Sequence, residues 1–190
     1  MAETQMRSMT PEEFYEWQLD QDERYELVDG VPVPLRAMTG ASNVHDAILV
    51  NCIGQLYAHL RGKPCRVASA DNALRTSIRT SRRPDVTVDC APLDGSSYEA
   101  QRPTVVIEVL SPSTPKIDRF TKLEEYRRHP SLRHILLIDP DTVAAKLYSR
   151  PDEGAWSDAD LIGRDAVVDL SAIEVALPVA ALYERIDLPA

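Results

Sequence analysis

Two apolar segments of the chain each contain one acidic residue at a place where burial is expected. The run Thr104–Leu110 is apolar at almost every position, which predicts a strand buried on both faces of a sheet. Glu108 interrupts this run, and Asp85 lies in a second apolar segment over residues 83–88. A buried carboxylate costs several kcal/mol unless a cation compensates it. The fold therefore has to bring positive charge to both acids.

A shared divalent metal is one way to supply that charge. The segment between Asp85 and Glu108 includes residues 91–102, a polar stretch with proline, glycine and serine, so two neighbouring strands joined by a loop fit the spacing. Carboxylate oxygens without a cluster of thiolates favour Mg²⁺ or Mn²⁺ over Zn²⁺. An acid in a strand is also compatible with an N-cap or with a buried arginine partner. The residues alone leave these alternatives open.

Local patterns predict most of the other elements. Thr10 before Pro11 and two glutamates marks a helix start, and Asp29-Gly30 between apolar runs predicts a two-residue β-hairpin. Helices are expected over residues 11–19, 42–60, 118–128 and 179–183. Strands are expected over residues 25–28, 31–33, 66–69, 73–78, 84–88, 105–110, 133–139 and 143–148, and a short apolar piece lies near residues 166–170. With no internal repeat or linker, residues 1–190 are expected to form one domain.

The formal net charge of −9 argues against a general affinity for nucleic acid, because phosphates favour basic surfaces. A local basic rim is nevertheless compatible with an acidic remainder. Four arginines close together in the sequence before Asp85 are the best candidates for such a rim, and a solvated turn explains them equally well. They are Arg75, Arg79, Arg82 and Arg83.

The three cysteines, Cys52, Cys65 and Cys90, are odd in number and form no CxxC pair. This pattern indicates neither a disulfide framework nor a structural zinc site, and buried thiols are the simpler interpretation. The chain opens with no charged-then-apolar leader, and no apolar stretch approaches the roughly 20 residues that cross a bilayer. We therefore expect a cytoplasmic protein in a reducing compartment.

One lysine is spaced to reach the two acids. Asp118, Lys122 and Tyr126 follow one another at steps of four and share one face of the helix expected over residues 118–128. An ammonium that reaches back over the strand ends would stabilise negative charge developing on a phosphate. A surface salt bridge between Asp118 and Lys122 is the competing explanation.

Several motifs occur in a characteristic order. In chain order they are Tyr25–Gly30, His45, Arg83–Val86, Glu108–Thr114, then Asp118, Lys122, Tyr126 and Leu137–Pro140. This set resembles the Uma-type putative restriction endonuclease family of the PD-(D/E)XK nuclease superfamily. The resemblance covers about residues 10–185, and its most specific piece is the Glu-Val-Leu-Ser-Pro-Ser-Thr stretch that begins at Glu108.

The resemblance implies an α/β fold of the α+β type, a restriction-endonuclease-like core in which helices flank a mixed sheet. It also implies that Asp85 and Glu108 bind a divalent metal, Mg²⁺ or Mn²⁺. Glu26 and His45 are implied as additional residues of the same site.

The sequence departs from the superfamily pattern at two places. The usual lysine two residues after the strand acid is absent, and Leu110 stands in its position. The resemblance suggests that Lys122 has taken over this role. Residues 129–134 also lack the glycine-centred turn that is more usual for the family, which affects the local loop rather than the metal site.

Three functions are compatible with these observations. The leading one is a metal-dependent endonuclease that hydrolyses phosphodiester bonds, with DNA as substrate and with Asp85, Glu108, Lys122, Glu26 and His45 as catalytic residues. A homodimer would match the two strands of a duplex. The others are an inactive nuclease fold used for binding or assembly, and a metal-dependent hydrolase of small substrates. A basic rim beside the acids would favour DNA, and an acidic rim would favour the other two.

Overall fold

The computed structural model describes residues 8–35, 42–111, 116–152 and 154–188. Its helices are α1 (Pro11–Gln18), α2 (Asn43–Leu60), α3 (Lys116–Arg128), α4 (Val179–Leu182) and the short 3₁₀ turn η2 (Ser171–Ile173). In the described part of the chain, no helix has the length and apolar character needed to cross a membrane.

A six-stranded sheet forms the centre of the molecule. Its strands are β3 (Arg66–Ser69), β6 (Val86–Asp89), β7 (Pro103–Val109), β8 (His134–Ile138), β9 (Ala144–Ser149) and β10 (Ser157–Ile162). They are arranged in the order β10-β9-β8-β7-β6-β3. Only β7 and β8 pair in parallel, and the other neighbours are antiparallel. Parallel neighbours need a crossover connection, and α3 lies between β7 and β8 in the sequence to provide it.

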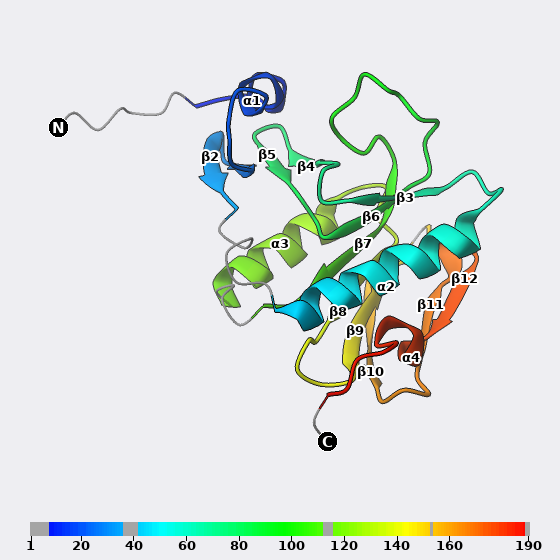
Figure 1. Cartoon of the computed structure of the whole chain (residues 1–190). Coiled ribbons are helices and arrows are strands. Elements are labelled where there is room, and N and C mark those ends of the chain that lie inside the picture. The colour runs from blue at the N-terminus through cyan, green and yellow to red at the C-terminus, as the bar shows by residue number, and fades with distance from the viewer. Residues whose placement is uncertain (1–7, 36–41, 112–115, 153, 189–190) are drawn as a thin grey trace.

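The two faces of the central sheet are covered by different helices (Figure 1). Successive side chains of a strand point to opposite faces. Val105 and Val109 of β7 pack in the large core cluster that includes α2, whereas Val106 packs with Tyr126 of α3. This alternation places Glu108 on the α3 face of the sheet. The mixed sheet with flanking helices is the expected fold class.

A hairpin completes the layer formed by α2. Its strands are β11 (Val167–Leu170) and β12 (Val175–Pro178), which pair antiparallel. Buried residues of this hairpin, of η2 and of α4 belong to the same core cluster as those of α2.

A smaller sheet carries α1. Its strands are β1 (Tyr25–Val28), β2 (Val31–Pro34), β4 (Leu74–Ser77) and β5 (Thr80–Arg82), in the order β2-β1-β5-β4. Asp29 and Gly30 have φ values of 50° and 82°, as the predicted two-residue hairpin requires. A Cβ at Gly30 would also displace the side chains of Ser8 and Arg79. Phe14 of α1 is fully buried and packs in a cluster with Leu27 of β1.

The predicted elements are present with ends that differ by at most two residues, but four strands were not predicted. They are β5, β10, β11 and β12, of which β11 lies in the apolar piece near residues 166–170. β5 has the sequence Thr-Ser-Arg and is too short and polar to show a period. β10 is an edge strand whose residues are almost all exposed, so it lacks the apolar alternation by which strands are predicted.

The expectation that all cysteines are free thiols is wrong. Cys65 and Cys90 form a disulfide, and Cys52 is a free, buried cysteine. Arg66 of β3 pairs with Asp89 of β6, so one step beyond the ladder Cys65 and Cys90 lie opposite each other. Only this register reveals the pairing. The disulfide also removes the support that the cysteines gave to a reducing compartment.

Candidate active site

Asp85 lies at the start of β6, beside the end of β7. The two strands pair antiparallel, with Val86 opposite Ile107. The Asp85 Oδ2 atom accepts a 2.8 Å hydrogen bond from the backbone N–H of Val109. It also lies 3.7 Å from Nε2 of His45, on α2. Burial raises the pKa of Asp85, and the Val109 N–H and His45 oppose this effect.

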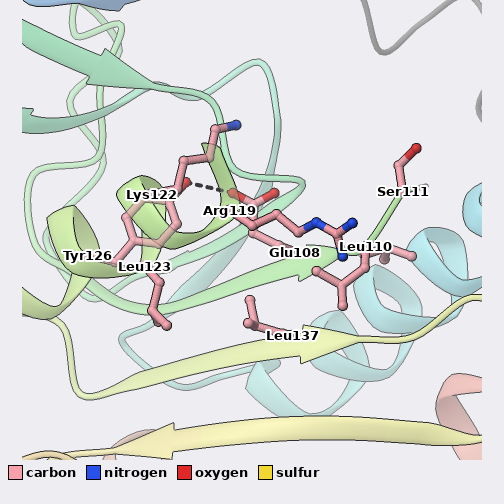
Figure 2. Close-up of a pocket in the computed structure, with 9 residues that line it drawn as sticks. Glu108, Leu110, Ser111, Arg119, Lys122, Leu123, Tyr126 and Leu137 are labelled. Carbon is pink, nitrogen blue, oxygen red and sulfur yellow. Dashed lines mark hydrogen bonds between the residues drawn. The ribbon is translucent and has the colours of Figure 1, made fainter. Parts of the chain in front are cut away.

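Glu108 lies near the end of β7 on the face covered by α3. The Tyr126 hydroxyl donates a 2.6 Å hydrogen bond to its Oε1 atom, and Figure 2 shows this contact between strand and helix. Burial raises the pKa of Glu108 to about 7, and the charge of Asp85 contributes in the same direction. Lys122 and the Tyr126 hydroxyl oppose the increase. Asp85 and Glu108 are therefore close enough to raise the cost of ionising each other.

Two cationic side chains compensate the negative charge of Glu26 on β1. Its side chain is buried, with its Oε1 atom 2.9 Å from Nζ of Lys122 and its Oε2 atom 3.0 Å from Nη1 of Arg82. The backbone N–H of Arg83 donates to the same carboxylate. Burial alone would raise the pKa of Glu26, but the charges of Lys122 and Arg82 hold it below the ordinary value. Glu26 is thus ionised and anchors Lys122.

A small pocket opens beside Glu108. Its volume is about 60 Å³, which is room for a few water molecules. Figure 2 shows Glu108, Arg119 and Lys122 with the apolar side chains of Leu110, Leu123 and Leu137 around it. The pocket lies between β7, β8 and the face of α3 that faces the sheet.

The structure brings together all five residues that the sequence selected. Asp85 touches His45, Lys122 touches Glu26, and the charge of Lys122 acts on Asp85 and Glu108. The Lys122 ammonium lies against Glu26 of β1, 2.9 Å from its Oε1 atom. The Asp118 side chain, the alternative partner of Lys122, lies outside the described part of the structure.

The donor set fits a hard divalent ion that keeps open positions. Within the described ranges, no group of three or more His, Cys, Asp or Glu side chains is arranged to hold a metal. Asp85 and Glu108 thus offer two carboxylates rather than a complete protein cage. Mg²⁺ is usually bound by one or two carboxylates, with water and substrate phosphates as its other ligands. Two half-buried acids with raised pKa values are the residues that gain most from such a cation.

Two of the four arginines proposed for a basic rim are instead paired with acidic side chains. Arg82 is buried and forms ion pairs with Glu26 and Glu125. Arg75 forms ion pairs with Glu12 and Glu99.

The other two arginines are held by uncharged groups. Arg83 donates to the backbone carbonyls of Tyr25, Ala70 and Asp71. Arg79 contacts Ser8 and the carbonyl of Asp29. All four arginines thus support the small sheet and its contacts.

Sequence reasoning missed three contributors to the site, which are Arg82, Glu125 and Arg119. Arg82 and Glu125 form two hydrogen bonds of 2.7 Å, and they link β5 to α3 behind Glu26. No sequence signal indicated this link, because β5 was not predicted. Tyr126 was placed on the face of Lys122 by its spacing, and this signal was sufficient to find it. Arg119, which precedes Lys122 by three positions on α3, lines the pocket.

Comparison with known proteins gives a consistent result. The family model Uma2, described as "Putative restriction endonuclease", matches residues 11–180. Two uncharacterized proteins of Synechocystis sp. are similar over most of their length. One, slr1290, is 32% identical over 92% of this chain and 91% of its own. The other, sll1609, is 25% identical over 88% of this chain and 95% of its own.

The fold has a counterpart among crystal structures. A protein from Anabaena variabilis, described as a putative nuclease belonging to DUF820, superposes with a TM-score of 0.71. The match covers 92% of this chain and 97% of that chain, at 20% sequence identity. At this identity the similarity establishes the fold.

Proposed function

The chain belongs to the Uma2 family of putative restriction endonucleases, and on that premise we propose that it is a divalent-metal-dependent nuclease of the PD-(D/E)XK type that hydrolyses phosphodiester bonds in DNA. Asp85 and Glu108 are the metal ligands in this proposal, and Mg²⁺ or Mn²⁺ is the ion. Lys122, Glu26 and His45 complete the site.

The difference between Glu26 and the other two acids carries the proposal. Glu26 has two cationic partners within 3.0 Å. In the described part of the structure, Asp85 and Glu108 have no lysine or arginine within 4.0 Å of their carboxylates. Their pKa values are raised, whereas that of Glu26 is lowered. Two neighbouring acids left in this state, one of which lines a pocket, are a common property of functional sites.

The residues around the pair have distinct roles in this proposal. The Val109 N–H and the Tyr126 hydroxyl fix the two carboxylates in position, so that little order has to be gained when the ion binds. Glu26 holds the ammonium of Lys122 beside the pocket. From there Lys122 would stabilise negative charge on the phosphate as the bond to the leaving group breaks.

The ion, when bound, would add further stabilisation of the charge on the phosphate. His45 lies 3.7 Å from Asp85, and its ring would favour the ionised form of that carboxylate when protonated. These assignments give Lys122 the role that lysine has elsewhere in the superfamily, although Leu110 occupies the usual position.

A cleavage assay with purified protein tests the proposal. Single-stranded, duplex and branched DNA are incubated with Mg²⁺, with Mn²⁺, or with chelator. We expect metal-dependent cleavage that the Asp85→Asn and Glu108→Gln variants abolish. Asp94→Asn, an equal change at an exposed loop residue, is the matched control and should cleave normally. Cleavage that survives in Asp85→Asn would show that the activity belongs to a contaminant.

One observation favours the small-substrate hydrolase as a second candidate. Two of the four arginines expected to form a basic rim, Arg75 and Arg82, are paired with acidic side chains, and the chain carries a net charge of −9. Neither feature favours a long polyanion. Hydrolysis of a small phosphodiester such as bis-p-nitrophenyl phosphate, lost in Asp85→Asn but unaccompanied by cleavage of any DNA, would support this candidate over the nuclease.

A further inference from the structure

A second pocket lies at the opposite end of the central strands from Glu108. Its volume is about 790 Å³. Thr104 at the start of β7 and His134 at the start of β8 line it, whereas Glu108 and Leu137 near the ends of these strands line the first pocket. From Thr104 to Glu108 the distance along the strand is about 13 Å. The two pockets are therefore separate places on one sheet.

Among the described residues, three arginines line this second pocket, together with a single acidic residue. The arginines are Arg102, Arg133 and Arg150, and the acid is Asp152. Asp152 is 92% exposed and pairs with Arg133 at 2.8 Å. Among the described residues, no carboxylate lies within 4.0 Å of Arg102 or Arg150. In a chain with a net charge of −9, two guanidinium charges in one cavity are thus left without a carboxylate partner by the residues that the structure describes.

Neutral groups fix the position of Arg150. Its Nη2 atom donates to the carbonyls of His129 at 2.8 Å and Leu132 at 2.7 Å, and its guanidinium stacks on Trp156 at 4.9 Å. Carbonyls orient a guanidinium without cancelling its charge. Burial, followed by the nearby charge of Arg133, lowers the pKa of Arg150. A bound anion would reverse that effect.

Contacts within the protein use only some of the hydrogen-bond donors of Arg102 and Arg150. Arg102 donates through Nη2 to the carbonyl of Cys90, and Arg150 uses its own Nη2 atom. Within the described residues, the Nη1 atoms of Arg102 and Arg150 have no hydrogen-bond partner. These donors belong to side chains that are already positioned, so a ligand would bind them with little loss of conformational entropy.

The pocket has the size and charge to accept a particular class of ligand. Small-molecule sites are about 300–1,000 Å³ in volume, so a mononucleotide fits the space. Guanidinium groups bind phosphate oxygens with two parallel hydrogen bonds, and two uncompensated guanidinium charges match a phosphate dianion. We propose that this pocket binds a phosphorylated small molecule of nucleotide size, with Arg102 and Arg150 on the phosphate.

The neighbouring histidine is not part of the anion contact. Ala172 N–H donates to Nε2 of His134, so the Nδ1 proton is directed to Ser149. Burial lowers the pKa of His134 to about 4, and the ring is therefore neutral near pH 7. Phosphate recognition rests on the arginines, and it does not depend on the metal site or on nuclease activity.

Titration calorimetry of the full chain tests this inference. The measurements use the Asp85→Asn background with chelator, so that the first site does not bind phosphate through a metal. The ligands are inorganic phosphate, AMP and a short DNA duplex, with sodium chloride at matched ionic strength. We expect saturable binding of phosphate and tighter binding of AMP.

Arg102→Gln is the test variant, because Arg102 is exposed and its loss should leave the fold intact. It should weaken AMP binding by about tenfold or more, the usual effect of losing a charged hydrogen bond. Arg61→Gln, at an exposed arginine beyond α2, is the matched control and should bind like the parent. Equal binding by the Arg102→Gln variant, or no heat beyond that of chloride, would overturn the inference. Binding of duplex without binding of AMP would also overturn it, and would indicate a nucleic-acid surface instead.

Discussion

The hydroxyl of Tyr126 donates a 2.6 Å hydrogen bond to the Glu108 carboxylate, and this contact links the helix of the candidate site to its central strand. Tyr126 is 1% exposed, so its ring has no freedom to turn away. The bond offsets part of the increase in the pKa of Glu108 that burial causes. The same tyrosine therefore fixes the position of the proposed ligand and helps to keep it ionised.

Replacing Tyr126 with phenylalanine should weaken metal binding. The ring still fills its buried position, but Glu108 loses a hydrogen bond that favours the charged form, and its pKa rises further above 7. We expect roughly tenfold weaker Mg²⁺ binding near pH 7, given the value of a hydrogen bond to a charged group. Calorimetric titration measures it, and Tyr148→Phe on β9 serves as the control. An unchanged affinity would show that Tyr126 only packs.

Metal binding should strengthen as the pH rises. A carboxylate must lose its proton before it binds a metal, and burial raises the pKa of Glu108 to about 7. Below pH 7 most of this residue is protonated, so each pH unit lost should weaken binding by about tenfold. Above pH 7 the affinity should level off. Mn²⁺ titrations at pH 6, 7 and 8 check the slope, and a flat profile would remove Glu108 from the ligand set.

Loss of Arg82 should destabilise the fold strongly. Arg82 is 2% exposed and pairs with both Glu26 and Glu125. The Arg82→Met variant leaves two acids without this partner in or near the interior, which costs about 3–5 kcal/mol. Urea denaturation measures the change. Arg127→Met removes a partly exposed pair with Glu124 and should cost about 1 kcal/mol or less. Similar losses in both variants would contradict the role given to Arg82.

The parts of the site that the sequence revealed are those with a local signal. Asp85 and Glu108 stand out because each lies beside an apolar run, and an acid in a buried strand calls for a partner. Lys122 and Tyr126 stand out through helical spacing. Arg82 had no such local signal. Its strand, β5, is only Thr-Ser-Arg, and the sequence of that segment does not predict that it pairs with β1. Arg82 was therefore assigned to a rim when it belongs to the interior.

The disulfide was also not predictable from local sequence signals. Cys65 and Cys90 are far apart in sequence and become neighbours only because β3 and β6 pair in one register. A shift of one residue in that register would separate them. The disulfide thus depends on the long-range pairing of two short strands, which the sequence does not reveal. The fold class, in contrast, could be predicted from the order of the longer elements.

The stability of the protein should fall as the pH is lowered from 6.5 to about 4, because His134 is buried in its neutral form. His134 is 3% exposed, and burial lowers its pKa from 6.5 to about 4. Between these values the unfolded chain takes up a proton that the folded chain does not. The contribution of neutral His134 to the free energy of unfolding is therefore fully present above pH 6.5. It decreases as the pH falls towards 4 and is lost below that value. The loss should amount to about 3 kcal/mol.

His134→Gln isolates this effect from that of the carboxylates. Glutamine does not ionise, and its side-chain oxygen can still accept from the Ala172 N–H that now binds Nε2. The variant should be less stable at pH 7 and should lose less stability between pH 6.5 and 4 than the parent, measured by urea denaturation. His59→Gln changes an exposed histidine and is the matched control. If the His134→Gln and parent profiles ran parallel, protonation of His134 would have no part in acid unfolding.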